Sequence, residues 1–318
     1  MKISIRMIRS TRLTAAAFVL AAGAGFQLQA ATTGPAQSAR QFSSPTDAVK
    51  ALVVATKAGD RAAVDAIFGP EVKDLLSGDA RQDAVEFADF AKSLEQYHRL
   101  VQKAEDRFVL NIGAQNWPFP IPLVRKGGAW SFDAAAGKDE IVNRRIGEDE
   151  LTAIGVCRTY VQAQREYASE DRDGTGVFQY AQKIKSTPGK KDGLYWPSSA
   201  GGDQSPFGPL VTEARTEGYG PPPAGAAPEP FHGYFFKIIT AQGPAAAGGA
   251  YNYVINGDLI AGFALVAYPA HWGESGVMTF IVNQWGKVYE SNLGAESAAI
   301  AAAMTEFDPD AGWSLVAP

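Results

Sequence analysis

The chain has 318 residues, of which 46% are hydrophobic and 20% are charged. This composition can bury a sizeable core and excludes a disordered or fibrous protein, and at roughly 100 to 200 residues per domain the length predicts two domains. The 29 basic side chains stand against 34 acidic ones, a formal net charge of −5. A broad phosphate-neutralising surface is therefore not expected, and we expect no nucleic-acid partner.

The first thirty residues have the pattern of a secretory signal peptide. An apolar run from Leu13 to Phe26 lies between a basic start and the small-residue sequence Leu28-Gln29-Ala30. The basic residues of that start are Lys2, Arg6, Arg9 and Arg12. Because the run is shorter than the ~20 residues that span a bilayer, we expect a cleaved signal over residues 1–30 and no membrane span after its removal. The mature protein is expected in the periplasm or secreted.

Cys157 is the single cysteine of the chain, so no intramolecular disulfide can form. It falls on the apolar side of a predicted helix, which favours a buried core residue over a nucleophile. No cysteine lies directly after the apolar run of the signal, which favours a free protein over a lipoprotein.

After a polar linker over residues 31–42, residues 43–140 are predicted to form an N-terminal α+β domain. Ser44-Pro45-Thr46-Asp47 is typical of a helix start, and Gly59-Asp60 separates this helix from a second one. A third helix over roughly 83–96 precedes extended segments at 98–104, 107–113, 119–125 and 129–133. A helical hairpin followed by an antiparallel sheet resembles the cone-shaped fold of nuclear transport factor 2 and its relatives, a fold that carries enzymes, binding modules and dimerisation domains alike.

Residues 141–318 are predicted to form a second α+β domain that begins with a long helix over 143–169. Loops rich in proline and glycine cover residues 197–230. They precede strands at 232–241, 250–256, 259–268, 277–283 and 286–290 and a C-terminal helix over 295–307. A long helix leading into a loop-rich antiparallel sheet resembles the globular head of pilin-like proteins. The fold class expected for the whole chain is therefore α+β.

Five longer phrases of the sequence are specific enough to compare with known families. They are Trp117-Pro118-Phe119-Pro120-Ile121-Pro122-Leu123, Asn143-Arg144-Arg145-Ile146-Gly147, Ala163-Gln164-Arg165-Glu166-Tyr167, Asp192-Gly193-Leu194-Tyr195-Trp196-Pro197 and Gly262-Phe263-Ala264-Leu265-Val266-Ala267-Tyr268-Pro269. Together they resemble the bacterial exported-protein family called domain of unknown function 2950, over nearly all of the mature chain. The resemblance implies an exported bacterial protein of uncharacterised function, and it supplies no catalytic residue.

The segment from Asp171 to Gly176 is the most suggestive of chemistry. Its two carboxylates, Asp171 and Asp173, and the hydroxyl of Thr175 stand at alternate positions, as in the first half of a calcium loop. The twelfth position is Gln182 and not the expected bidentate Glu, so any calcium site here would be weak. The alternative is an acidic turn that ends a helix, with Gly174 or Gly176 in a left-handed conformation. No other cofactor is expected.

The C-terminal loops hold the remaining candidate binding residues. Each candidate is an aromatic residue, a histidine or an acid placed in a turn or loop, where a sugar ring or a peptide could stack. They are Asp192, Tyr195, Trp196, His232, His271, Trp272 and Glu274. The three histidines of the chain form no close pair typical of a zinc site. The mature sequence also lacks a serine-nucleophile elbow and a nucleotide-binding glycine motif, so no catalytic residue is assigned.

Two hypotheses from different classes remain. The first is a non-catalytic exported protein that binds an envelope protein or a glycan through its aromatic loops. The second is an envelope hydrolase whose site is assembled in the C-terminal loops from Asp192, His232, His271 and Glu274. A cleft that gathers at least three of these residues would favour the enzyme, and scattered exposure would favour binding.

Overall fold

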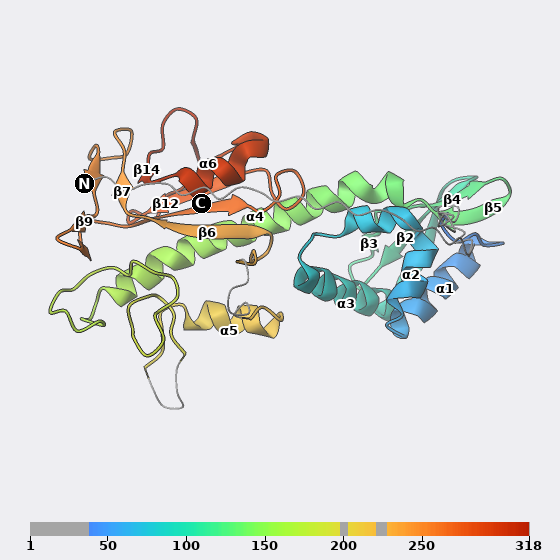
Figure 1. Ribbon diagram of the computed structural model, residues 1–318. Helices are drawn as coiled ribbons and strands as arrows, with labels where there is room; N and C mark the ends of the chain where they lie inside the picture. The colour runs from blue at the N-terminus through green and yellow to red at the C-terminus, as the bar shows by residue number, and fades with distance from the viewer. Residues whose placement is uncertain (1–37, 198–202, 221–227, 318) are drawn as a thin grey trace, which may run out of the picture. The chain divides into compact units, whose positions relative to one another are not determined.

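A computed structural model describes residues 38–197, 203–220 and 228–317 (Figure 1). The chain is an α+β protein, as the sequence predicts, and the residues from Gln37 onward form one compact unit. The predicted signal peptide and most of the predicted linker lie outside the described residues. Among the helices that the structure describes, none is both long and apolar enough to cross a membrane.

The first half of the described chain begins with helices whose starts follow local capping chemistry. The Ser44 hydroxyl accepts a hydrogen bond from the Asp47 amide at 3.1 Å, and the Asp60 carboxylate accepts one from the Ala63 amide at 2.9 Å. Both caps satisfy amides that lack a partner within the helix, and both predicted helix starts are confirmed. The helices are α1 (Pro45–Lys57), α2 (Arg61–Phe68), the 3-10 helix η1 (Pro70–Leu75) and α3 (Ala80–Gln96).

These helices pack against an antiparallel sheet with the strand order β1-β2-β4-β5. A short strand, β3, pairs with β2 beside that path. Phe42, in the predicted linker, is buried and exchanges two backbone hydrogen bonds of 2.8 Å with Trp130 on β5, so this residue joins the folded part. The strands are β1 (His98–Ala104), β2 (Arg107–Ile112), β3 (Trp117–Pro118), β4 (Leu123–Lys126) and β5 (Ala129–Phe132).

One long helix, α4 (Ala134–Tyr167), contributes to both hydrophobic clusters of the chain. It begins at Ala134 and not near Asn143, because the Asp133 carboxylate caps it by accepting a hydrogen bond from the Ala136 amide at 3.2 Å. Gly137 brings the first turns close to the loop between β3 and β4, since a Cβ at this position would lie 2.9 Å from the Ile121 side chain. The alanines of its first turn lack the apolar periodicity that marks a helix in the sequence.

The second half is built on a sheet with the order β15-β13-β12-β11-β6, in which every paired neighbour is antiparallel. All residues of β12 are buried, which requires cover on both of its faces. Helix α4 covers one face and α6 the other (Figure 1). The elements are β6 (Tyr234–Ile239), β11 (Ala264–Pro269), β12 (Thr279–Asn283), β13 (Val288–Ser291), β15 (Ser314–Leu315) and α6 (Ser297–Ala303).

Smaller elements extend this half. A three-stranded sheet of order β14-β7-β8 includes one parallel pair, β14 with β7. Helix α5 lies inside the stretch that the sequence predicts to be loops. These elements are α5 (Gly208–Thr216), β7 (Ala241–Gln242), β8 (Tyr251–Asn252), β9 (Val254–Ile255), β10 (Asp258–Leu259), the 3-10 helix η2 (Gly294–Glu296) and β14 (Glu306–Phe307).

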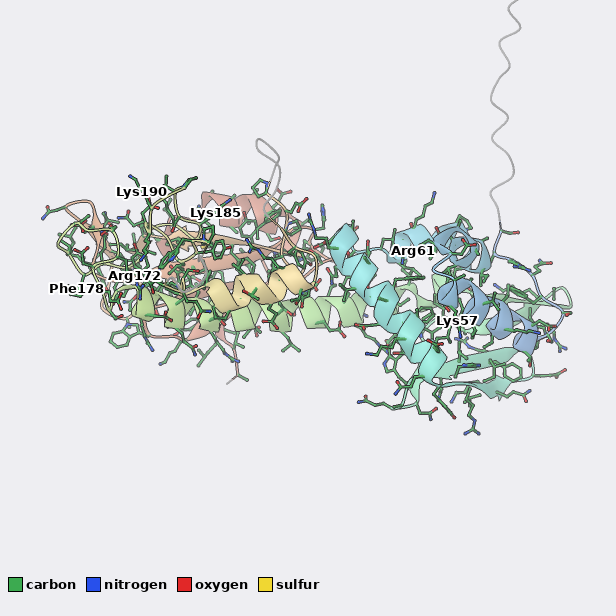
Figure 2. All side chains as sticks on the ribbon, turned by 90° about the horizontal axis from the view of Figure 1, so that it is seen from below. Lys57, Arg61, Arg172, Phe178, Lys185 and Lys190 are labelled. Carbon is green, nitrogen blue, oxygen red and sulfur yellow. The ribbon has the colours of Figure 1, made fainter. Side chains whose placement is uncertain are left out.

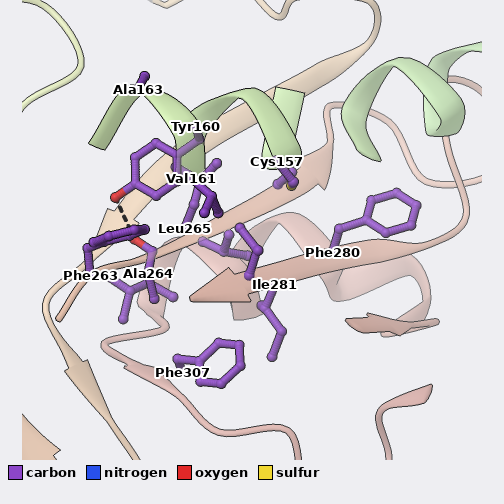
Figure 3. Packing of buried hydrophobic residues seen from close by; sticks show 14 of the residues in the cluster. Cys157, Tyr160, Val161, Ala163, Phe263, Ala264, Leu265, Phe280, Ile281 and Phe307 are labelled. Atoms are coloured by element: carbon purple, nitrogen blue, oxygen red, sulfur yellow. Dashed lines mark hydrogen bonds between the residues drawn. The ribbon is translucent and has the colours of Figure 1, made fainter. Parts of the chain in front are cut away.

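Figure 3 shows how α4 packs on the C-terminal sheet. Cys157, Tyr160 and Val161 point from α4 toward the strands. The side chains of Ile281 and Phe307 lie on the face of the sheet that is turned away from α4. The Cys157 side chain is fully buried, and burial raises the pKa of its thiol to about 12. The prediction that Cys157 is a core residue is confirmed.

A buried hydrogen-bond network ties α4 to its surroundings through Tyr160. The Tyr160 hydroxyl donates to the Ala264 carbonyl at 3.1 Å and accepts from the Gln164 amide at 2.9 Å. The Gln164 side chain also exchanges two 2.8 Å hydrogen bonds with the backbone of Ala181. Each group is buried, so each needs its partner.

We expect Tyr160→Phe to lower the free energy of unfolding by about 1 to 2 kcal/mol, because the Ala264 carbonyl loses a buried donor. Urea unfolding followed by circular dichroism measures the change. Tyr97→Phe, at an exposed tyrosine, is the matched control and should change it by less than about 0.5 kcal/mol. Equal effects of the two substitutions would show that the network does not stabilise the fold.

Candidate functional site

A cavity of about 630 Å³ opens between α3, the end of β2 and α4. Five residues of α3 line it and fall on one side of the helix, because they recur at helical spacing. They are Glu86, Asp89, Phe90, Ser93 and Gln96. One helix therefore supplies the cavity with two carboxylates, an aromatic ring and two neutral polar groups.

A tight turn after β2 forms the second wall. Gly113 has φ +71°, and its amide donates to the carbonyls of Ser93 and Tyr97 at 3.0 Å, which fixes the turn against the end of α3. Asn116 also has a positive φ of 56° and donates through its amide to the Gly113 carbonyl at 2.9 Å. The turn leaves Trp117 at the cavity, with 40% of the residue exposed.

The third wall is one face of α4. Ile141, Arg144, Arg145 and Glu148 follow the spacing i, i+3, i+4 and i+7, so their side chains share this face. The close approach of the helix at Gly137 sets its distance from the loop between β3 and β4, and Pro120 of that loop also lines the cavity. The cavity thus depends on the early start of α4.

Apolar rings form much of the cavity surface. Phe90 and Phe119 stack with ring centroids 4.9 Å apart, and Ile112 and Ile141 lie beside them. Such a surface favours the flat apolar face of a ring or a short apolar group.

Arg144 covers the Trp117 ring at the edge of this surface. Its guanidinium carbon lies 4.5 Å from the ring centroid, and its Nε donates to Glu140 at 2.6 Å. The Nη1 atom of Arg144 is buried and has no hydrogen-bond partner among the described residues. It is therefore a donor that a bound acceptor oxygen could satisfy.

Arg145 is buried deeply in the same wall, with only 4% of the residue exposed. Its Nη2 donates to the Leu75 carbonyl at the end of η1. Its Nε lies 3.7 Å from Glu86 Oε1, too far for a hydrogen bond, and finds no partner in the described part of the chain. Burial raises the pKa of Glu86, and the charge of Arg145 opposes that rise.

Asp149 lies behind this wall and is the most deeply buried carboxyl group of the cluster, with 1% of the residue exposed. Its Oδ1 accepts a hydrogen bond from the Gln82 side chain on α3 at 2.8 Å. Burial raises the pKa of Asp149 to about 8, although the Gln82 hydrogen bond acts against the rise. Gly233 makes room for it, since a Cβ there would lie 2.8 Å from Asp149 Oδ2, and its φ is +68°.

The structure gives the candidate residues of the C-terminal loops separate surroundings. Asp192 accepts from the Thr187 amide at 2.7 Å, the Thr187 hydroxyl at 2.8 Å and Lys183 Nζ at 2.7 Å. These contacts, with that to Lys183 the largest, hold the pKa of Asp192 well below its usual range. This carboxylate stabilises its own loop.

The two aromatic neighbours of Asp192 differ in exposure. Trp196 is buried, donates to the Asp203 carbonyl at 3.2 Å, and has Arg172 and Lys191 over its ring. Tyr195 is half-buried, and its hydroxyl accepts from Arg215 at 2.7 Å. Of the two rings, only Tyr195 keeps a partly accessible side chain.

His232 and His271 have different hydrogen-bond partners within the described residues. His232 Nε2 is 2.8 Å from Glu217 Oε2, and its backbone has a φ of +43°. His271 is exposed in a turn whose backbone also holds Glu274, with the Glu274 amide donating to the His271 carbonyl at 3.1 Å. No hydrogen bond or ion pair among the described residues joins Asp192, His232 and His271 to one another.

Trp272, in the same turn as His271, is 41% exposed and donates to Asn292 at 3.0 Å. It is thus a partly accessible ring on a fixed loop. Glu274 lines a separate cavity of about 620 Å³, which also includes Lys138 and Arg145.

The predicted calcium residues form a compact turn. Asp171 accepts from the amides of Thr175 at 3.1 Å and Gly176 at 2.9 Å, while Asp173 accepts from the Thr175 hydroxyl at 3.0 Å and from Gln179 at 2.7 Å. Gly174 and Gly176 both have positive φ, as expected for an acidic turn. No group of three metal-binding side chains occurs within the described ranges. The weak calcium site stays a prediction.

Sequence reasoning missed the cavity between α3 and α4. From the sequence, Arg144 and Arg145 are expected to be solvated or paired with nearby acids. Arg144 does form a hydrogen bond with Glu140, but Arg145 is buried, which the sequence does not indicate. Two features of the sequence could have indicated the cavity: acids fall beside Phe90 on one side of α3, and a set of polar residues shares one face of α4. The face of α4 was not recognised because this helix was expected to begin near Asn143.

The buried carboxyl group makes stability depend on pH. The folded-state pKa of Asp149, about 8, lies above the unfolded value of about 3.9, so folding takes up a proton between these two values. The stability that this group contributes is full below about pH 4 and is lost as the pH rises toward 8, by up to about 1.4 kcal/mol per pH unit. Asp149→Asn, which keeps an acceptor for Gln82, should remove this loss.

Urea unfolding of both proteins at pH 5, 6, 7 and 8 tests the expectation. The stability of Asp149→Asn relative to the unsubstituted chain should rise with pH. Glu105→Gln, at a largely exposed acid, is the control and should give a flat difference. A flat difference for Asp149→Asn as well would mean that Asp149 is ionised in the fold.

Comparison with known proteins places the chain in a family. No curated protein and no solved structure matches it. A family model described as a protein of unknown function, DUF2950, matches residues 39–316. This range holds both hydrophobic clusters, the cavity and all the sequence phrases that suggested the resemblance. The chain therefore belongs to the family of domain of unknown function 2950.

Proposed function

We propose that this protein is an exported, non-catalytic binding protein, and that the cavity between α3 and α4 binds a ring of a glycan. The observation that carries the proposal is the pairing of an apolar surface with unused polar groups. Phe90, Phe119 and Trp117 offer ring faces, while Arg144 and Arg145 each retain a buried donor that has no partner among the residues the structure describes. Sugar rings present an apolar face and a rim of hydroxyls, which matches both features.

The charges around the cavity favour a neutral ligand. Two arginines, Arg144 and Arg145, face three acids, Glu86, Asp89 and Glu148. Because the charges nearly balance, an anionic ligand would gain little from the arginines and would meet the carboxylates. Hydroxyl groups can donate to the carboxylates and accept from the guanidinium groups at once.

The fold resemblances expected from the sequence also support a binding function. Helices α1 to α3 packed on an antiparallel sheet are consistent with a cone like that of nuclear transport factor 2, a fold that carries binding modules among other functions. A long helix on an antiparallel sheet agrees with a pilin-like head in the second half. Partly accessible aromatic rings there, Tyr195 and Trp272, are suited to an envelope protein or glycan partner.

The glycan proposal predicts saturable binding of a soluble oligosaccharide. The purified full chain is titrated by calorimetry with chitin oligosaccharides, which are neutral. Trp117→Ala and Phe90→Ala should each weaken binding about tenfold or more, because each removes ring contact with the ligand. Trp285→Ala, at a tryptophan that is 67% exposed and outside this cavity, is the control and should leave the affinity unchanged.

The same titrations distinguish the two candidate surfaces. If Trp272→Ala weakens binding while Trp117→Ala does not, the ligand binds at the C-terminal loops and the cavity assignment is wrong. If no oligosaccharide binds to the unsubstituted chain at millimolar concentration, the glycan proposal is wrong.

The location of the protein is also a proposal, supported by the order of basic, apolar and small residues before Ala30. Expressed with its first thirty residues in a bacterium, the chain should be recovered from the periplasm or the medium. N-terminal sequencing should show cleavage near Ala30. A mature protein that still begins at Met1 would contradict export through a cleaved signal.

An envelope hydrolase remains the second candidate function, with its site in the cavity between α3 and α4 and not in the C-terminal loops as the sequence suggests. One observation favours it: Glu86 faces the cavity with a raised pKa, which suits a general acid. Mass spectrometry of the oligosaccharides after incubation with the chain distinguishes the two. Intact oligosaccharides support binding alone, and cleavage that is lost in Glu86→Gln supports hydrolysis.

A further inference from the structure

A second cavity, of about 210 Å³, lies in the C-terminal half and has a different chemistry. Every residue that lines it is apolar. They are Val156 on α4, Ile184 and Phe207, then Leu210, Val211 and Ala214 on or beside the inner face of α5, followed by Phe231, Phe236 and Leu265. Since no lining side chain carries a hydrogen-bonding group, the cavity favours a hydrocarbon over a polar ligand.

Helix α5 forms one wall of this cavity, and the way it is held suits a movable cover. None of its residues is buried, while Leu210 and Val211 pack against the core only in part. Its anchors are near the ends: Phe207 is buried and donates through its amide to the Leu194 carbonyl at 2.9 Å, and Arg215 donates to the Tyr195 hydroxyl at 2.7 Å. Figure 1 shows α5 beside α4, whose Val156 forms part of the opposite wall.

The size of the cavity limits its occupant. A cavity of about 150 Å³ lined by Leu, Ile and Phe accommodates benzene, so in proportion this one suits roughly eight carbon atoms. Aliphatic side chains outnumber the three phenylalanines in the lining. An unbranched alkyl chain fits such an irregular aliphatic space by rotating about its single bonds.

Charge beside the cavity indicates the head group. Lys185 directly follows the lining residue Ile184, and Arg215 directly follows Ala214; both are exposed. Neither forms an ion pair within the described ranges, although Arg215 donates to the Tyr195 hydroxyl. Two acids lie on or directly beside α5, Glu213 and Glu217, and Glu217 contacts His232 at 2.8 Å. Figure 2 shows Lys185 extending from the segment that precedes α5. Because His232 engages Glu217, the two cations Lys185 and Arg215 outnumber the remaining acid of α5, Glu213, and favour a carboxylate.

We propose that the cavity beneath α5 binds the alkyl chain of a medium-chain fatty acid of about eight carbons, with its carboxylate near Lys185 and Arg215. This site is independent of the glycan cavity, because the two share no lining residue.

The test is calorimetric titration of the full chain with octanoate and with octanol. Both should bind saturably, and octanoate should bind more tightly. Val156→Phe and Ala214→Leu fill the cavity from opposite walls and should weaken both ligands at least tenfold. Val54→Phe, on an exposed position of α1, is the matched control and should change neither affinity.

Thermal unfolding checks that the filled variants are folded. Ala214 lies on a surface helix, so Ala214→Leu should not lower the melting temperature. Lys185→Gln with Arg215→Gln should weaken octanoate and spare octanol. No saturable binding by the unsubstituted chain, or unchanged binding by the folded filled variants, would overturn the site. Equal loss of both ligands in the double glutamine variant would overturn the carboxylate assignment.

Discussion

The burial of two ionisable side chains on one helix is the constraint from which much of this structure follows. Arg145 and Asp149 lie one turn apart on α4, where the helix passes from the N-terminal hydrophobic cluster to the C-terminal one. Each is nearly inaccessible to water, so each needs a compensating partner. Arg145 donates to the Leu75 carbonyl and lies beside Glu86, while Asp149 accepts from Gln82 and keeps its proton at neutral pH. These partners bring η1 and α3 to the helix.

Helix α4 also connects two cavities of contrasting character. Its early residues, such as Arg144, add donors and acceptors to a space lined by aromatic rings, and Val156 further along faces a space lined only by hydrocarbon. The contrast follows from what each stretch of the helix packs against. The N-terminal stretch of α4 packs beside α3, which carries charged side chains. The C-terminal stretch packs against a sheet whose strand β12 is wholly buried. One continuous element thus contributes to binding surfaces that suit chemically different ligands.

Much of the fold was accessible from the sequence, because local signals and tertiary packing agree there. The start at Ser44, the strand over 98–104 and the buried Cys157 all follow from capping, alternation or apolar register. The sequence did not reveal α5, which is short and lies within a stretch rich in proline and glycine, or the true start of α4, where small residues give no periodicity. The cavity was missed for a related reason: its walls come from three elements, and only folding brings Glu86, Trp117 and Arg145 together.

The seclusion of Cys157 has a practical consequence for observing this protein in solution. A thiol that is fully buried, with a pKa near 12, has almost no thiolate at neutral pH and reacts slowly with maleimides or oxidants. The natural chain therefore behaves toward such reagents as if it contained no cysteine. A cysteine introduced on the outer face of α5 could carry a fluorophore or spin label without any substitution at Cys157, and its signal would report on the surroundings of that one helix.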